Sequence, residues 1–197
     1  MKKIFILLLF PFFCFTQDFN AGIIGGLSTS QVSGDQLSGF NKIGPRIGFF
    51  VNRKINWYNL QLELQYISKG SKKVINNQNT YTDYINDYRF HLDYIGIPIS
   101  INSTITGKIK LETGSSINIL IKQKEEIDFY VDNSREVKKL DYCYFIGLFW
   151  DINNHYSINV RLSNSIFPIR EHSSGETYRW NRGQYNTVLS FSMYYKI

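Results

Sequence analysis

The sequence predicts an all-β protein, an eight-stranded antiparallel up-and-down barrel. Apolar and polar residues alternate with a period of two in eight segments, whereas the periodicity typical of helices is weak. The connections between these segments are alternately short and long. The last alternating segment runs to Ile197, and we expect it to pair with the first strand and close the barrel.

The N-terminal stretch has the proportions of a secretory signal peptide. Two lysines precede an apolar run over residues 4–15, which is too short for a helix that crosses a bilayer, since that takes roughly 20 residues. Cys14 and Thr16 place smallish side chains at the −3 and −1 positions of a cut before Gln17. We therefore expect residues 1–16 to be removed and residues 17–197 to form one barrel domain.

Two alternatives concern the same stretch. Lipid attachment at Cys14 is disfavoured because the large Phe13 precedes it, and an uncleaved membrane anchor is the second alternative. Cleavage lowers the formal charge from +6 to +4, because 20 basic residues then face 16 acidic ones. This excess is diffuse and lacks any run of lysines and arginines, so no nucleic-acid partner is expected. Cys143 would be the only cysteine left, which excludes an intramolecular disulfide.

The first four predicted strands have apolar faces that alternate over residues 19–27, 43–51, 60–66 and 95–101. The first is rich in glycine, and the third alternates leucines with Gln61, Glu63 and Gln65. Leu92 and Tyr94 are one step out of phase with the fourth strand, so we expect a bulge near Tyr94 that returns both to the apolar face. Pro98 lacks an amide hydrogen and predicts a further irregularity there.

The last four predicted strands alternate over residues 109–121, 142–150, 156–162 and 189–197. Short turns are expected at residues 53–58, 104–107 and 152–154. Long polar loops are expected at residues 29–42, 70–88, 122–140 and 168–184. Short turns at one end and long loops at the other are typical of outer-membrane barrels, with the turns periplasmic and the loops extracellular.

The composition of the two strand faces indicates which one points outward. The apolar face is uniformly large and ends in aromatic residues, as in the girdles of a transmembrane barrel, whereas the other face mixes glycines with bulky ions. A soluble ligand-binding barrel, the alternative, would have its apolar face inside. We therefore predict a transmembrane barrel in the outer membrane, reached by export.

The polar face predicts a filled lumen. Eight strands leave an interior just wide enough for side chains, and charges enclosed there must pair. We expect a structural charge cluster near mid-height made of Arg46, Glu63, Lys110, Glu112 and Arg161, with Phe145 and Phe149 adding bulk. This arrangement indicates a plug that conducts no solutes.

Two motifs could carry chemistry but are better explained otherwise. His155 and Ser157 form the pattern that a lipid-modifying enzyme could use as base and nucleophile, but His155 falls in a turn and no acid is placed to orient it. His91 and Asp93 could be paired as metal ligands, but a lone pair at a strand end is more often an interfacial contact. We expect no catalysis, no metal and no cofactor.

The fourth long loop is the candidate binding surface. It carries a tryptophan among arginines, a combination that could hold a glycan, a lipid A phosphate or a protein partner. The residues are Arg170, Arg179, Trp180 and Arg182. The alternative is a loop that packs on itself.

Three motifs resemble those of a known family. Gly26, Leu27, Ser28, Ser30 and Gln31, followed by Gly34 and Asp35, resemble its N-terminal G-L-x-x-S pattern with a later G-D pair. The second is the run Glu63, Leu64, Tyr66, Ser68, Lys69, Gly70 and Ser71, and the third is Leu92, Tyr94, Ile95, Ile97 and Pro98. Together they resemble the PorT-like outer-membrane β-barrel proteins of the Bacteroidetes. Gly114 followed by Ser115 departs from the Gly-Pro pair of many members.

The resemblance implies an eight-stranded outer-membrane barrel, and the family's founding member is associated with protease secretion through the type IX pathway. We expect a non-enzymatic protein with a structural, assembly or loop-mediated binding role. An accessory role in type IX secretion and a lipid-modifying enzyme are the alternatives. The expected partners are outer-membrane lipids and other envelope or secretion proteins.

Overall fold

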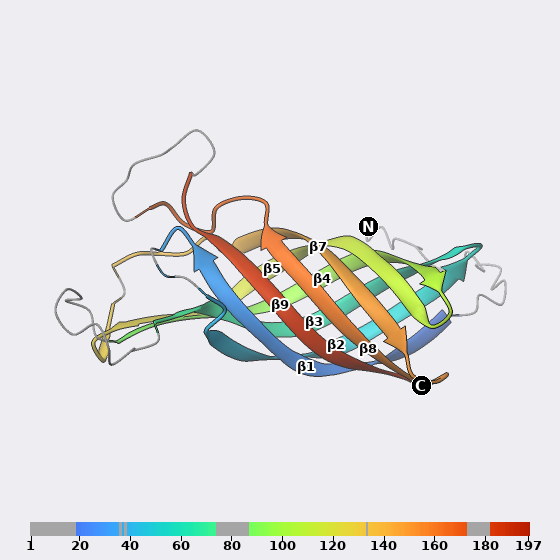
Figure 1. The fold of residues 1–197 in the computed structure, drawn as a ribbon. Coiled ribbons are helices and arrows are strands. Elements are labelled where there is room, and N and C mark those ends of the chain that lie inside the picture. Colours follow the sequence, from blue (N-terminus) through green and yellow to red (C-terminus); the bar gives the residue numbers. More distant parts are fainter. Residues whose placement is uncertain (1–18, 36, 38, 74–86, 133, 173–181) are drawn as a thin grey trace, which may run out of the picture.

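The chain folds as a closed, eight-stranded antiparallel barrel, which confirms the predicted fold class (Figure 1). The computed structural model describes residues 19–35, 37, 39–73, 87–132, 134–172 and 182–197. The signal peptide predicted over residues 1–16 lies outside these residues and stays a prediction. No helix in the described part is long and apolar enough to cross a membrane.

Eight long strands and one short one make up the sheet. They are β1 (Phe19–Ser33), β2 (Lys42–Ile55), β3 (Tyr58–Lys72), β4 (Tyr88–Thr106), β5 (Ile109–Ile127), β6 (Tyr130–Val131), β7 (Leu140–Asp151), β8 (Tyr156–Ser165) and β9 (Tyr185–Lys196). The two residues of β6 pair back onto the last residues of β5 as a hairpin, beyond the point where β5 pairs with β7. The other eight strands form the barrel.

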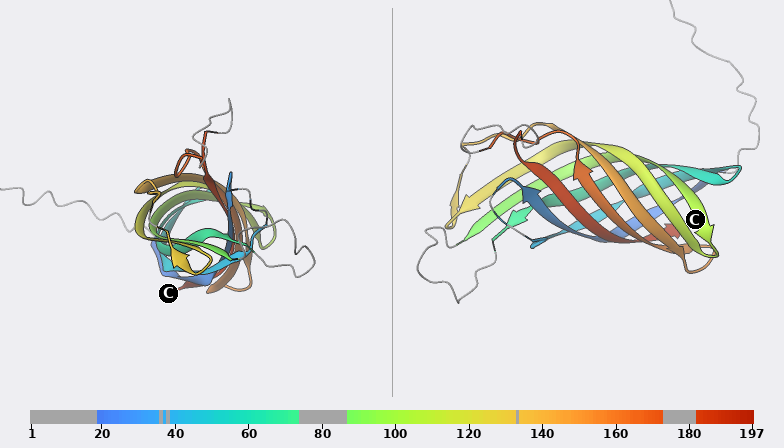
Figure 2. Two further views of the ribbon diagram at one scale, coloured as in Figure 1. Left: turned by 90° about the vertical axis from the view of Figure 1, so that its left-hand side faces the viewer. Right: turned by 45° about the horizontal axis from the view of Figure 1, so that its top comes forward.

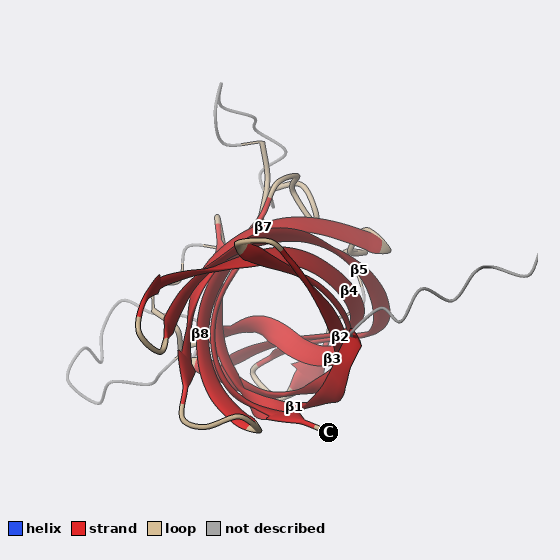
Figure 3. Ribbon diagram, turned by 90° about the vertical axis from the view of Figure 1, so that its right-hand side faces the viewer, coloured by secondary structure: helices blue, strands red, loops and turns tan. Residues whose placement is uncertain are grey.

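The barrel closes between its first and last strands. Each long strand pairs with its neighbours in the chain, and β1 also pairs with β9. Leu27, for example, lies opposite Pro45 of β2 on one side and Phe191 of β9 on the other. No long strand is therefore left at an open edge, as a sheet in lipid requires. The views along the barrel show the closed ring (Figures 2 and 3).

The exterior is apolar and the interior polar, as predicted. In β3, Leu64 is 52% exposed, while its neighbour Glu63 is 2% exposed and points inward. The same alternation runs through the other long strands. Apolar side chains on an outer surface are stable only against lipid, so this arrangement is that of a membrane barrel.

The connections fall into two classes at the two ends of the barrel. The turn end carries the short connections at residues 56–57, 107–108 and 152–155, and the loop end carries those at 34–41, 73–87, 128–139 and 166–184. Asn56 and Gly107 have positive φ values of 53° and 49°, which suits tight turns. The strands run further toward the loop end than predicted, because residues 122–127 belong to β5.

The bulge predicted near Tyr94 exists, but its effect differs from the prediction. The register shifts where Asp93 pairs with Lys122 and Tyr94 with Leu120, so the extra residue is Ile121 in β5. The alternation in β4 continues unbroken, and Leu92 and Tyr94 are fully buried inside the barrel. The prediction that they reach the outer face was wrong, because the bulge lies in the partner strand.

Pro98 interrupts one ladder, as predicted. In the β4–β5 ladder, Pro98 pairs regularly with Ser116. The β3–β4 register instead lacks the pairs that would join Glu63 to Pro98 and Leu64 to Ile97. The missing amide hydrogen of proline explains the gap.

The wall bends inward at the loop end. The pairing of β2 with β3 stops at Arg46 and Ile67. Beyond that point Ser28 of β1 donates to the Ser68 carbonyl at 2.8 Å, and Ser30 donates to the Gly70 carbonyl at 3.0 Å. The last residues of β3 therefore lie across the inner face of β1 and narrow the loop end of the lumen.

Gly44 of β2 makes this approach possible. A Cβ at this position would lie 2.7 Å from both the Cβ and the carbonyl oxygen of Ser68. Such contacts are too short for a side chain, so any larger residue would push β3 out of the mouth.

Candidate functional site in the lumen

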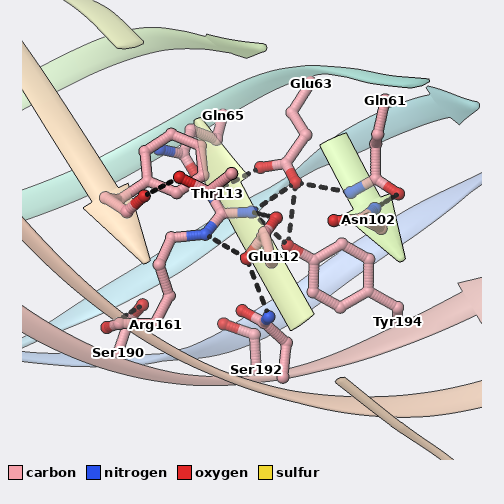
Figure 4. A network of polar contacts seen from close by, with 12 residues as sticks. Gln61, Glu63, Gln65, Asn102, Glu112, Thr113, Arg161, Ser190, Ser192 and Tyr194 are labelled. Carbon is pink, nitrogen blue, oxygen red and sulfur yellow. Dashed lines mark hydrogen bonds and ion pairs between the residues drawn. The ribbon is translucent and has the colours of Figure 1, made fainter. Parts of the chain in front are cut away.

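Four charged side chains meet at mid-height in the lumen. We call Arg46, Glu63, Glu112 and Arg161 the charge cluster; they come from β2, β3, β5 and β8. All four are buried, and their two positive and two negative charges sum to zero. Because they come from strands around the whole barrel, their contacts bridge the lumen. Figure 4 shows three of them, Glu63, Glu112 and Arg161, with their polar partners.

Arg161 lies between the two glutamates. Its guanidinium donates to both carboxylate oxygens of Glu112 at 2.6 and 3.0 Å, and to both of Glu63 at 2.7 and 3.0 Å. Arg46 adds an ion pair to Glu63 at 3.0 Å. Such forked contacts are specific to arginine, and a lysine could not reproduce them.

The remaining polar atoms of the charge cluster are also satisfied. Arg46 donates to Gln65, Asn159, Ser190 and Ser192, and Asn159 donates to Glu112. The Tyr194 hydroxyl accepts from Arg46 at 2.9 Å and donates to Glu63 at 3.0 Å. A buried ionic network is stable only when every member has its partners, and this one does.

Lys110 does not join these residues, so its expected place in the cluster was wrong. Its side chain points inward but lies near the turn end, 27% exposed, where it pairs with Asp151 at 2.5 Å. The physical reason is height along the strand. Lys110 is the second residue of β5, two positions closer to the turn than Glu112.

Tyr194, a hydrogen-bond partner of the charge cluster, was not singled out by the sequence analysis. It stands on the polar face of β9 in line with Ser190 and Ser192. A large aromatic residue among inward serines was the available signal. Its ring stacks edge-on against Phe149 and tilts against Phe50, with centroids 4.8 and 5.3 Å away.

The lumen toward the loop end contains a cluster of buried apolar side chains. We call this set the loop-end plug: Val32, Ile67, Phe90, Leu92, Tyr94, Val137, Ile169 and Val188. A buried ion pair adjoins the plug, since Lys69 and Asp141 are 3.0 Å apart and Lys69 lies over the Tyr94 ring. The sequence pattern did not predict this plug.

Arg170 lies over the plug and is not available for binding, which corrects its expected role. It is buried, forms an ion pair with Glu125 and stacks over the Phe90 ring. Burial alone would lower the Arg170 pKa, but the hydrogen bond and charge of Glu125 raise it above its usual value. Of the other predicted loop residues, Arg182 is exposed. Arg179 and Trp180 lie outside the described residues.

The turn end of the lumen is open. We call this hollow the turn-end vestibule; its volume is about 660 Å³, and polar side chains such as Asn52, Gln61 and Asn102 line it. Its inner end meets the aromatic layer of Phe50, Phe149 and Tyr194, which adjoins the charge cluster. The vestibule is therefore a blind cavity.

The two motifs that could carry chemistry are not assembled into sites. His155 contacts the Lys196 carbonyl through Nδ1, whereas Ser157 donates to Asp151 at 2.8 Å. The two side chains thus have different partners. Within the described residues, no three His, Cys, Asp or Glu side chains are grouped to hold a metal, so His91 and Asp93 have no third ligand of these types there.

Comparisons with known proteins agree with this architecture. A family model described as outer membrane protein beta-barrel domain matches residues 15–171. The crystal structure of Ail, the attachment invasion locus protein of Yersinia pestis, aligns with a TM-score of 0.52 at 11% identity, over 91% of this chain and 99% of Ail. The crystal structure of Neisserial surface protein A aligns with a TM-score of 0.54 at 10% identity, over 90% and 97%. At these identities the likeness concerns the fold. No functionally curated protein matched the sequence.

Proposed function

The chain belongs to the family of outer membrane protein beta-barrel domains, and from this premise we propose that it is a non-enzymatic barrel with a closed lumen that acts through its loops, in a structural, assembly or binding role. The supporting observation is the charge cluster, which spans the lumen with every charge paired. A barrel closed in this way offers solutes no path, so we place its contacts with partner proteins on its loops.

The hairpin between β5 and β6 is the surface that we propose for those contacts. Its tip carries three exposed apolar residues, with Phe129 78% and Tyr130 81% exposed, followed by Val131. The tip lies at the loop end, past the β5–β7 pairing, since β6 pairs with the last residues of β5. Exposed apolar clusters on polar loops are typical of protein-binding surfaces.

A deletion strain tests this proposal. We expect the deletion to weaken the envelope, measured as detergent sensitivity, and wild-type protein to restore it. The variant Phe129→Ser/Tyr130→Ser should reach the membrane in normal amounts but fail to restore resistance. Phe40→Ser, an exposed aromatic residue of the β1–β2 connection, is the matched control. Equal rescue by both variants would contradict a role for this tip.

Export by a cleaved signal peptide is part of the proposal. The apolar run over residues 4–15 and the small side chains before Gln17 support cleavage there. N-terminal sequencing of protein purified from the sarkosyl-insoluble fraction should begin at Gln17. A mature protein that retains residues 1–16 would contradict it.

An accessory role in type IX protein secretion is the second candidate. The three motifs that resemble the PorT-like barrels of the Bacteroidetes support it, and Lys69 of the second motif lies in the buried ion pair with Asp141. Loss of secreted cargo proteins from the deletion strain would favour this role over a purely structural one. The separate partners of His155 and Ser157 disfavour lipid modification, which altered lipid A in mass spectra would support.

A further inference from the structure

The turn-end vestibule has the features of a binding site that the proposed loop function does not use. Its volume of about 660 Å³ falls within the range of roughly 300–1,000 Å³ that is usual for small-molecule sites. It opens at the end with the short turns, which faces the periplasm in barrels of this kind. A ligand would therefore reach it from the periplasm.

The rim of the vestibule is basic. Four lysines line the cavity against one aspartate, a formal charge of +3, and they are Lys54, Lys108, Lys110 and Lys196. Asp151 neutralises only Lys110, to which it is paired. The cavity therefore favours a ligand that carries negative charge, and carboxylates are suitable partners for lysine.

Side-chain amides in the wall of the vestibule form a series of hydrogen bonds, in which the NH2 group of each amide donates to the next residue. Asn20 donates to Asn52 at 3.0 Å, Asn52 donates to Gln61 at 3.3 Å, and Gln61 donates to Glu63 of the charge cluster at 2.7 Å. This series of hydrogen bonds determines which amide atoms remain available to a ligand.

One acceptor deep in the wall has no partner. Asn102 also donates to Gln61, at 3.4 Å, and its Oδ1 atom is buried without a hydrogen bond while the residue is only 3% exposed. A buried unpaired acceptor is costly and requires a donor. Asn59 and Asn154 also line the cavity, and amide oxygens accept hydrogen bonds. Phosphate and other simple anions offer few donors or none, so the best ligand carries N–H or O–H groups as well as negative charge.

The inner end supplies an apolar surface. Phe50, Phe149 and Tyr194 form the aromatic layer there, and Trp57, 73% exposed, lines the mouth. Sugar rings and acyl groups combine hydroxyls with apolar faces and can pack on such rings. Figure 3 shows the barrel along its axis, viewed from the turn end.

We propose that the turn-end vestibule binds an acidic, amide-bearing glycopeptide of the kind that peptidoglycan presents in the periplasm. Its carboxylates pair with the lysine rim, its amide or hydroxyl hydrogens donate to the amide side chains that line the cavity, such as Asn59 and Asn154, and its sugar packs against the aromatic side chains. The barrel would thereby be anchored to the cell wall, independently of what its loops bind.

Calorimetric titration of the mature protein in detergent micelles tests this inference. The probe is a disaccharide–tetrapeptide muropeptide, compared with the tetrapeptide alone, an uncharged N-acetylglucosamine disaccharide and inorganic phosphate. We expect saturable binding of the muropeptide and weaker binding of each part. The variant Lys54→Ala/Lys196→Ala should lower the muropeptide affinity about tenfold or more, since a hydrogen bond to a charged group is worth about that factor.

A matched control removes two lysines from the other end of the barrel. Lys122→Ala/Lys139→Ala makes the same change in charge at exposed positions far along β5 and beside β7 and should leave the affinity unchanged. Equal losses in both variants would show non-specific attraction and overturn the proposal. So would the absence of muropeptide binding, or phosphate or the tetrapeptide alone binding as tightly. These outcomes leave the loop function untouched, because the Phe129 and Tyr130 tip is tested separately.

Discussion

The two ends of the lumen are built by the same strands but are filled differently. Toward the loops, inward positions of β3, β4 and β9 carry Ile67, Leu92 and Val188, which pack into the loop-end plug. Toward the turns, the inward positions of β3 and β4 carry Gln61 and Asn102, which line an open cavity. Strand alternation therefore sets which way a residue points, whereas side-chain chemistry and size decide whether that part of the lumen is closed.

The charge cluster lies at the boundary between these two regions. The charge cluster blocks the lumen by ion pairs that cross it, whereas the plug blocks the lumen by packed apolar side chains. Tyr194 connects the charge cluster to the aromatic layer at the inner end of the vestibule. We therefore expect substitutions at the cluster and in the plug to lower stability strongly, and substitutions in the vestibule to leave stability nearly unchanged.

Glu63→Gln should have the largest effect. Glu63 accepts hydrogen bonds from both arginines, and its neutralisation leaves Arg46 and Arg161 with Glu112 as the only counter-charge in the cluster. An uncompensated buried charge costs roughly 3–5 kcal/mol, so the free energy of unfolding in urea should fall by that amount. Glu126→Gln, at a partly exposed ion pair with Lys124, is the control and should change little. Equal stability of the two variants would contradict the cluster's role.

Leu92→Ala should have the second largest effect on stability. Leu92 is fully buried in the plug, and its truncation leaves a cavity that costs roughly 2–5 kcal/mol. Denaturant unfolding in lipid vesicles provides the measurement. The matched control is Leu62→Ala, a half-exposed leucine on the outer face of β3, which should lose less. A larger loss at Leu62 would indicate that the plug is not packed.

Leu148→Arg tests the outer surface that both regions share. Leu148 is half exposed on the outer face of β7, three positions before the strand ends at Asp151. Arginine on the lipid face costs roughly 2–4 kcal/mol at the bilayer centre and less toward the interfaces, so we expect a loss of about 1–3 kcal/mol. We expect the variant to fold poorly into vesicles, whereas Leu148→Phe should fold like the wild type. Normal folding of the arginine variant would mean that the inner and outer faces have been exchanged.

Asn59→Ala should have the smallest effect. Asn59 lines the open vestibule, where water replaces the lost side chain, so the change should be within about 0.5 kcal/mol. The same unfolding assay checks it. A loss as large as that of Leu92→Ala would contradict the contrast between the two ends.

The sequence predicted the barrel and the facing of its strands because one face meets lipid and must be apolar. Glu63, Glu112, Arg46 and Arg161 were predicted to meet inside, and the structure brings them together. Near the loop end an apolar residue no longer has to be on the outer face, because apolar side chains also pack inside the lumen there. The inward positions of Leu92 and Tyr94 were therefore not predicted.

The misplacement of Lys110 and Arg170 has a related cause. Alternation gives the direction of a side chain but neither its height in the barrel nor its partner from a distant strand or loop. Lys110 pairs with Asp151 near the turn end, and Arg170 of the last loop pairs with Glu125 of β5 over the plug. Such pairs depend on the register of closure, which no local pattern contains.

Single-channel recording in planar bilayers tests the central claim most directly. The cluster and the plug together should exclude a continuous column of water, so purified wild-type monomer should insert without stable conductance steps at any voltage. Insertion can be checked independently by the protease resistance of the recovered protein. Reproducible nanosiemens-scale steps from the folded monomer would show that the lumen is open and that the account of its closed half is wrong.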